Sequence, residues 1–519
     1  MSTNVGNATG SEIELSPGQQ DPGHSPRELF RKRLGFFLGL ALAALVYFIM
    51  PSDLPHALRG TAAIAIIMAA WWMSEAIPIT ATALLPLVLF PAFGIAEMKE
   101  FSTSYASPTI FLFMGGFLLA LGMQRWNLHK RIALWVLVAM GSSPKMLILG
   151  FMTATGFLSM WVSNTATAVM MLPIGISVLS LIVGLLKSEK TSEELEEEME
   201  STARGEAPSS NFGIALMLGI AYAASIGSLG TVIGTPPNTM LRAYMAEQGV
   251  EIGFGQWMLV GVPIAIVLMI AAWLLLTTVL FKPEIDHIPG GRELMRKELS
   301  KLGGMSRGEA SVMTIFVIAA LAWILVPVFF KGSMFSDAVI AMLVGTALFI
   351  IPGAPNGVPL LRWADALELP WGVLLLFGGG LALSSQFGKS GLSDWIGEQM
   401  SGLNVLPMVA LVVIVAAVVL ALTEFTSNTA TAATFLPLMG ALAIGMGIDQ
   451  MFLTVPVALA ATSAFMMPVA TPPNAIAYGS GYVTMGNMVK AGIWLNIAAL
   501  ILISVVSVTL SVWVFGLVF

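Results

Sequence analysis

The hexapeptide Ser163-Asn164-Thr165-Ala166-Thr167-Ala168 recurs letter for letter at Ser427-Asn428-Thr429-Ala430-Thr431-Ala432. When the comparison is extended to Pro173 and Pro437, eight of the eleven positions agree. Two further pairs flank it in the same order. They are Met114-Gly115-Gly116 with Phe377-Gly378-Gly379, and Gly234-Thr235-Pro236-Pro237-Asn238 with Ala470-Thr471-Pro472-Pro473-Asn474. Three matched landmarks in one order indicate an internal duplication.

The duplicated motifs lie in a chain of membrane-protein composition. Hydrophobic residues make up 57% of the 519 positions and charged residues only 10%. A soluble protein of this length needs about 25% charged residues, so a soluble fold is excluded. Apolar runs near the ~20 residues that cross a bilayer predict about eleven transmembrane helices. They lie at 33–50, 57–73, 79–95, 106–123, 212–230, 256–281, 310–330, 335–352, 366–386, 452–468 and 487–518.

Two apolar blocks, 145–185 and 403–447, do not fit this pattern, and each holds one hexapeptide near its middle. Unpaired backbone groups in hydrocarbon cost several kcal/mol each, so a polar break there needs a structural role. Ser and Asn are favoured helix N-caps. We therefore expect each block to form a re-entrant helical hairpin whose second arm starts at the Ser-Asn-Thr sequence.

The Thr-Pro-Pro-Asn motifs predict two further helix breaks. A residue before proline is displaced from helical geometry, whereas proline suits the first turn of a new helix. Half-helices should therefore begin at Pro236 and Pro472. Free helix N-termini attract anions, and the carbonyl ends of the preceding half-helices suit a hard cation. Because these motifs contain no Lys or Arg, a bound dianion would need co-bound cations.

The landmarks also indicate the domain organisation. Residues 1–30 are expected to form a disordered cytoplasmic tail and 31–56 a first transmembrane helix outside the repeat. The first repeat would span 57–281, with hairpin 145–185 and an inserted acidic loop at 186–210. A cytoplasmic linker, 282–309, would precede the second repeat at 310–519, with hairpin 403–447. An odd number of crossings in each repeat would invert one copy relative to the other.

Charge distribution predicts the orientation. With the N-terminus in the cytoplasm, 19 of the 24 Lys and Arg residues lie inside, and the five outside are Arg59, Lys99, Arg242, Lys331 and Lys389. The positive-inside rule then favours a cytoplasmic N-terminus and an external C-terminus. The chain contains no cysteine, which excludes disulfides and thiolate metal sites.

The motifs together resemble those of the divalent anion/sodium symporter family, over nearly the whole chain from about residue 33. Besides the Ser-Asn-Thr and Thr-Pro-Pro-Asn pairs, the resemblance rests on three stretches: Trp72-Met73-Ser74-Glu75-Ala76-Ile77-Pro78, Thr80-Ala81-Thr82-Ala83-Leu84-Leu85-Pro86 and Leu128-His129-Lys130-Arg131-Ile132-Ala133-Leu134. It implies a homodimer in the plasma (inner) membrane. Each protomer would have a scaffold domain and a transport domain that moves like an elevator.

The resemblance also implies a set of site residues. One sodium ion would be bound by Ser159, Ser163, Asn164 and the Gly234 carbonyl, and a second by Thr423, Ser427, Asn428 and the Ala470 carbonyl. Ser159 and Thr423 each lie four residues, about one helical turn, before the motif serine. Substrate carboxylates would meet Asn164, Thr165, Asn428, Thr429, Thr471 and Pro472.

These expectations favour sodium-coupled symport of C4-dicarboxylates such as succinate, malate or fumarate. A sodium-independent dicarboxylate exchanger and a sodium-coupled citrate or sulfate transporter remain alternatives on the same fold. An ion channel is disfavoured because no continuous polar path is visible, and an enzyme because no nucleophile–base pair or metal cluster lies within membrane segments. No cofactor beyond the coupling sodium ions and no nucleic-acid partner is expected. The roles of Glu75 and Glu424 stay open.

Overall fold

The computed structural model describes residues 25–140, 143–189, 210–285, 291–330, 334–399 and 406–518. Within these residues the structure is helical, and its β pairing is confined to an isolated bridge between Pro352 and Pro359. Residues 1–24 of the expected tail and 190–209 of the expected acidic loop lie outside the described residues.

Helices of the first half account for each apolar run of the first repeat. They are α2 (Pro26–Ile49), α3 (His56–Ser74), α4 (Ile79–Thr82), α5 (Leu85–Ala92), α6 (Met98–Phe101), η1 (Ser102–Ala106), α7 (Pro108–Arg125), α8 (Leu128–Met140), α9 (Pro144–Ser159), α10 (Asn164–Glu189), α12 (Asn211–Ser228), α13 (Pro236–Glu247), α14 (Phe254–Leu274) and η2 (Leu275–Leu280).

The second half has a similar order after a helix in the expected linker. It contains α15 (Gly291–Lys301), α16 (Arg307–Phe329), α17 (Asp337–Ile350), α18 (Trp363–Ala366), α19 (Trp371–Lys389), α20 (Leu392–Gln399), α21 (Met408–Thr423), α22 (Asn428–Gly445), α23 (Met451–Thr462), α24 (Pro472–Gly479), α25 (Met485–Val508) and α26 (Leu510–Phe515).

The first helix starts earlier than the sequence predicts. Ser25 is its N-cap, and the Ser25 hydroxyl accepts a hydrogen bond of 3.3 Å from the backbone N–H of Glu28. Pro26 follows at the first helical position, where its fixed φ favours helix initiation. Residues 26–30, expected in the tail, therefore belong to α2.

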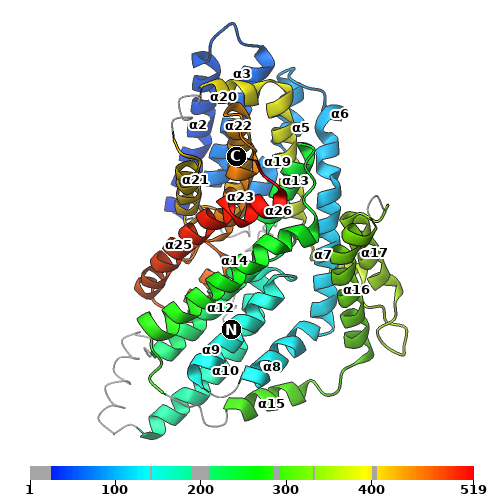
Figure 1. Ribbon diagram of the computed structural model, residues 1–519, viewed down its shortest axis with the longest axis vertical. Helices are drawn as coiled ribbons and strands as arrows, with labels where there is room; N and C mark the ends of the chain where they lie inside the picture. The colour runs from blue at the N-terminus through cyan, green and yellow to red at the C-terminus, as the bar shows by residue number, and fades with distance from the viewer. Residues whose placement is uncertain are drawn as a thin grey trace, which may run out of the picture.

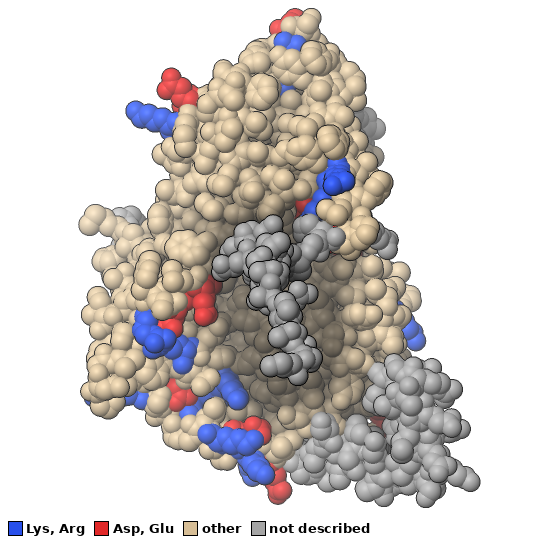
Figure 2. All heavy atoms as spheres, turned by 180° about the vertical axis from the view of Figure 1, so that it is seen from behind, with Lys and Arg blue, Asp and Glu red and all other residues tan. Residues whose placement is uncertain are grey.

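Nine helices in the described part of the chain are long and apolar enough to cross a bilayer. Three of the eleven expected runs form shorter helices, because breaks or turns interrupt them. They are the runs at 79–95, 335–352 and 452–468. Large apolar side chains on α2 and α16 are exposed, among them Phe37, Phe48, Ile318 and Phe329. Figure 2 shows broad uncharged areas between a few patches of charged residues. Such apolar surfaces are typical of lipid contact.

The helices are divided here into two contacting groups, called bodies below. In the first, here called the frame, α2 packs on α3, α7 on α17, and α16 on α17, with α4, α5 and α19 beside them. The second, here called the binding body, consists of α9, α10 and α12–α14 with α21–α25. In Figure 1, α14 and α25 cross the middle of the molecule side by side, and α16 and α17 lie together at its right edge.

Contacts inside the binding body are reciprocal between the repeats. Helix α10 packs on α24 of the other repeat, and its counterpart α22 packs on α13. Likewise α12 packs on α24, and its counterpart α23 packs on α13. This reciprocal packing brings the duplicated motifs of both repeats into one body.

Small residues allow the first hairpin to approach the first broken helix closely. A Cβ atom at Gly227 of α12 would lie 2.2 Å from the Gly156 carbonyl oxygen of α9. Real side chains do not fit at that separation, so this crossing requires glycine. The close approach places the end of α9 against the end of α12, where both helices break.

Candidate functional site at the broken helices

All four helix breaks fall at the duplicated motifs. The hairpin helices end at Ser159 and Thr423, and their partners begin at Asn164 and Asn428. In the other pair, α12 ends at Ser228 before α13 begins at Pro236, and α23 ends at Thr462 before α24 begins at Pro472. Thr235 and Thr471 are extended, with φ of −145° and −141°. Proline at the next position explains this geometry.

Two of the four hydroxyl groups at the breaks cap the helix that follows, and two do not. Ser163 accepts a hydrogen bond of 3.2 Å from the N–H of Ala166, and Thr471 accepts one of 3.3 Å from the N–H of Asn474. The Thr235 and Ser427 side chains do not cap their helices. Each repeat therefore has one break capped by a side chain and one that is not.

A cavity of about 800 Å³ lies between the two bodies and joins the motifs of both repeats. Its size is in the range of small-molecule sites. Ten of the twelve residues that the sequence predicts for the site line it: Ser163, Asn164, Thr165, Gly234, Ser427, Asn428, Thr429, Ala470, Thr471 and Pro472. The other two, Ser159 and Thr423, are fully buried behind the two asparagines.

Three oxygen atoms converge at the first hairpin. The Ser159 hydroxyl lies 3.0 Å from Asn164 Oδ1 and 2.5 Å from the carbonyl oxygen of Ala224. On its other side, Asn164 donates through Nδ2 to the Ser228 hydroxyl at 3.3 Å. The cluster thus connects the hairpin tip to the end of α12.

The second hairpin repeats this arrangement. The Thr423 hydroxyl lies 2.8 Å from Asn428 Oδ1 and 2.8 Å from the Ala461 carbonyl oxygen. A hydroxyl has a single proton to donate, but in each cluster two acceptors face it. Each cluster therefore has a surplus of oxygen lone pairs, the ligand type that hard cations prefer.

Two further asparagines stabilise the breaks, and the sequence analysis assigned them no role. Asn238 Nδ2 donates to the carbonyls of Ser228, Leu229 and Thr231, at 2.9 to 3.3 Å. Asn474 Nδ2 donates to the carbonyls of Ala464 and Met467. The sequence signal for this role is their equivalent position, because each asparagine is the last residue of a Thr-Pro-Pro-Asn motif. Each links carbonyls of the segment that precedes its half-helix to the start of that half-helix.

Within the part of the chain that the structure describes, three charged side chains line the cavity, and none belongs to the duplicated motifs. They are Arg31 of α2, Glu75 at the end of α3, and Glu368. Arg31 and Glu75 form one contact of 3.5 Å between Nη2 and Oε2, and both side chains are about half exposed. The sequence left Glu75 without a role, and the structure places it at the cavity with a left-handed φ of 51°.

Comparison with known proteins fits this geometry. The family model for the sodium:sulfate symporter transmembrane region matches residues 31–517. The chain belongs to this family. The chain is 43% identical over 485 residues to the sodium-dependent dicarboxylate transporter SdcS of Staphylococcus aureus strain USA300, covering 91% of each chain. SdcS of strain MRSA252 is 42% identical over the same length. The chain is therefore a membrane transporter and not an enzyme.

The fold also resembles a solved transporter. The crystal structure of the YdaH transporter of Alcanivorax borkumensis superposes with a TM-score of 0.53, covering 93% of this chain and 98% of that chain. The two sequences are 14% identical, so the likeness concerns the fold alone.

Glu424 has a structural role. Its buried carboxylate accepts hydrogen bonds from the backbone N–H groups of Phe465, Met466 and Met467, at 2.8 to 3.0 Å. It also accepts one of 2.6 Å from Nδ2 of Asn496. These bonds fix the segment between α23 and α24, which ends at Ala470. The matching position in the first repeat is Met160, so this anchor is present in one repeat only.

Proposed function

We propose that the chain is a secondary active transporter that carries C4-dicarboxylates such as succinate, malate and fumarate by sodium-coupled symport. The observation that carries this proposal is the convergence of four helix breaks, two from each repeat, on one cavity. The similarity to sodium-dependent dicarboxylate transporters supports the choice of ion and substrate.

The buried oxygen clusters are the proposed sodium sites. Ser159, Ser163, Asn164 and the Gly234 carbonyl would bind one ion, and Thr423, Ser427, Asn428 and the Ala470 carbonyl the other. The acceptor surplus around the Ser159 and Thr423 hydroxyls supports this assignment, because Na⁺ needs oxygen ligands and no proton.

The substrate would bind on the cavity side of these ions. Asn164, Thr165, Asn428, Thr429, Thr471 and Pro472 lie at the starts of α10, α22 and α24, where helix N-termini favour anions. N-termini from both repeats provide two anion positions, which suits two separate carboxylates better than one sulfate. The sodium ions behind Asn164 and Asn428 would offset the charge of the dianion.

Transport would follow an elevator mechanism in a homodimer at the plasma membrane. The binding body corresponds to the expected transport domain and the frame to the scaffold domain. With the N-terminus cytoplasmic and the C-terminus outside, the cavity beside Arg31 opens toward the cytoplasm.

Uptake of labelled succinate into proteoliposomes tests the proposed function. We expect accumulation under an inward sodium gradient and background uptake when choline replaces sodium. Vesicles preloaded with succinate separate symport from exchange, because only an exchanger requires internal substrate. Excess malate, citrate or sulfate as competitor then defines the substrate class. Equal uptake in choline would overturn the sodium coupling.

Removing the buried hydroxyls should weaken sodium binding selectively. Thr423→Val keeps the side-chain shape but removes the hydroxyl that faces Asn428, and Ser159→Ala does the same in the first repeat. One lost interaction with a charged group is worth about 1.5–3 kcal/mol, so half-saturating sodium should rise roughly tenfold or more. Sodium titration of succinate uptake measures this. An unchanged sodium dependence in both variants would remove the clusters from the coupling sites.

A further inference from the structure

An ion pair crosses the boundary between the two bodies away from the binding cavity. Arg242 of α13 belongs to the binding body, and Asp337 begins α17 of the frame. Arg242 Nη2 lies 2.9 Å from Asp337 Oδ2. The two residues are only 9% and 5% exposed, so the pair is shielded from water.

Asp337 holds a second part of the binding body as well. Its Oδ2 atom accepts a hydrogen bond of 3.1 Å from the backbone N–H of Phe254, the first residue of α14. Its carbonyl oxygen accepts one of 3.0 Å from Trp323 of the frame. The rings of Phe254 and Trp323 stack with centroids 4.7 Å apart. One frame carboxylate thus binds two helices of the opposite body in an apolar setting.

The pair lies on the side of the frame that faces away from the cavity. Leu348 of α17 is near the cavity side, because a Cβ atom at Gly122 of α7 would touch it. The α7 residues Leu121 and Gln124, close to Gly122 in sequence, line the cavity. Asp337 precedes Leu348 by eleven residues, which is about 16 Å along a helix. Arg242 lies six residues, about 9 Å, beyond the cavity residue Pro236.

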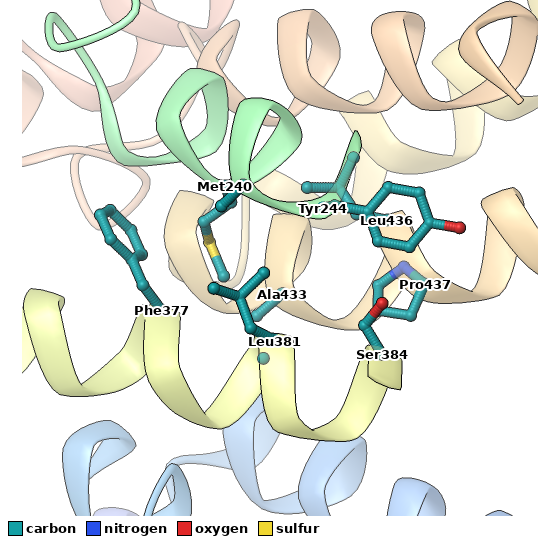
Figure 3. Close-up of a pocket in the computed structure, with 10 residues that line it drawn as sticks. Met240, Tyr244, Phe377, Leu381, Ser384, Ala433, Leu436 and Pro437 are labelled. Atoms are coloured by element: carbon teal, nitrogen blue, oxygen red, sulfur yellow. The ribbon is translucent and has the colours of Figure 1, made fainter. Parts of the chain in front are cut away.

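The neighbouring contact between the bodies is apolar where α13 faces α19 and α22, and farther along α13 the Glu247 carboxylate accepts a hydrogen bond of 3.5 Å from the Ser104 hydroxyl. A cavity of about 10 Å³ lies at the apolar contact. Figure 3 shows α13 facing α19 and α22 around it. Its labelled lining residues are Met240, Tyr244, Phe377, Leu381, Ser384, Ala433, Leu436 and Pro437. Hydrophobic contact is non-directional, so it permits displacement of one body along the other. The Arg242–Asp337 pair adds a directional bond to this surface.

The hydrogen bonding of Arg242 is less complete than that of the buried Arg131. Arg131 donates to both carboxylate oxygens of Glu309 and to three backbone carbonyls. In Arg242, the buried Nε and Nη1 atoms have no hydrogen-bond partner among the described residues. Unmet buried donors raise the free energy of this arrangement. Hydration of these two donors would therefore favour a state in which the contact is open.

We propose that Arg242 and Asp337 form a reversible latch that closes the side opposite the cavity and breaks when the binding body moves. This inference rests on the two-body movement in the proposed function. Removal of one partner leaves a buried uncompensated charge, which strongly destabilises the latched state, whereas removal of both does not. Single neutral variants should therefore populate the opposite-facing state.

Thiol labelling tests the latch without any substrate. Because the chain contains no cysteine, Val469→Cys supplies a single thiol at an exposed position in the cavity. A membrane-impermeant maleimide is applied to right-side-out and to inside-out vesicles. We expect one-sided labelling in the V469C parent. Adding R242Q or D337N should raise labelling from the other side at least tenfold, and R242Q/D337N together should stay within about threefold of the parent.

The matched control is R125Q. Arg125 Nη1 lies 2.7 Å from Asp365 Oδ2, and this pair joins α7 to α18 within the frame, so R125Q should leave the sidedness unchanged. Unchanged labelling in both single variants, or single effects that simply multiply in the double variant, would overturn the latch. These outcomes do not depend on succinate uptake, so they are separate from a failure of the proposed function.

If the single variants do not reach the membrane, a second measurement tests the same contact in a double variant. R242C/D337C contains no buried charge at the contact, and a short bifunctional maleimide can join its two thiols. Cross-linking should arrest uptake, whereas the same reagent should leave the wild-type chain active. Continued uptake by the cross-linked variant would mean that this contact need not open.

Discussion

Replacing Asn164 or Asn428 with alanine is expected to reduce sodium-driven succinate uptake to background. Each asparagine contacts a buried hydroxyl through Oδ1 and starts a helix that lines the cavity. One substitution thus removes a proposed sodium ligand and a proposed substrate contact together. At about 1.5–3 kcal/mol per interaction with a charged group, two such losses give a reduction of at least a hundredfold. Initial uptake rates in proteoliposomes measure the effect.

The fold should survive these substitutions. Asn164 and Asn428 are only partly buried, and the truncations remove few packing contacts. Thermal unfolding without sodium should therefore match the wild type, while stabilisation by added sodium should be lost. Asn356→Ala, at an exposed position in the turn after α17, is the matched control and should transport normally. Wild-type uptake by either site variant would contradict the assignment of both ions and substrate.

Glu424→Ala is expected to cause the largest loss of stability. The change leaves the N–H groups of Phe465, Met466 and Met467, and the Asn496 amide, without their acceptor. Each unsatisfied buried donor costs about 1–3 kcal/mol, and the sum approaches the 5–15 kcal/mol that stabilises a typical protein. We expect a strongly reduced melting temperature, little protein in the membrane and no uptake.

Glu424→Gln separates the charge from the shape of this side chain. The glutamine amide retains one acceptor oxygen but presents a donor to the remaining N–H groups. The melting temperature of E424Q should therefore lie between those of the wild type and E424A. Glu298→Ala removes a carboxylate that pairs with Lys301 at the surface and should change stability by no more than about 0.5 kcal/mol. A wild-type melting temperature for E424A would show that the segment before α24 is held by other contacts.

The helix breaks could be located from local signals in the sequence. Proline after Thr235 and Thr471 restricts the backbone in any fold, and a polar Ser-Asn-Thr inside an apolar block needs a turn. The observed ends of α9 and α12 agree with these rules. The first residue of a helix is harder to predict. Helix α2 begins at Pro26 after the cap residue Ser25, within a stretch whose polar composition predicts a tail.

These local rules do not predict which side chains that are distant in sequence will contact each other. The sequence noted Glu424 but left open whether it tunes a cation or makes a structural bond. Its partners lie 41 to 72 residues away, and their hydrogen bonds form only after α21, α23 and α25 pack together. Arg242 and Asp337 are likewise joined only by the packing of α13 against the frame.

The sequence by itself determined that the protein is a duplicated membrane protein, and where its helices break. These properties follow from hydrophobic run length, proline stereochemistry and capping preferences, all of which act within a few neighbouring residues. Only the tertiary structure decided that ten motif residues share one cavity, that Glu424 is an anchor, and that an ion pair joins the two bodies. Those facts depend on how whole helices pack, and no spacing along the chain encodes that packing.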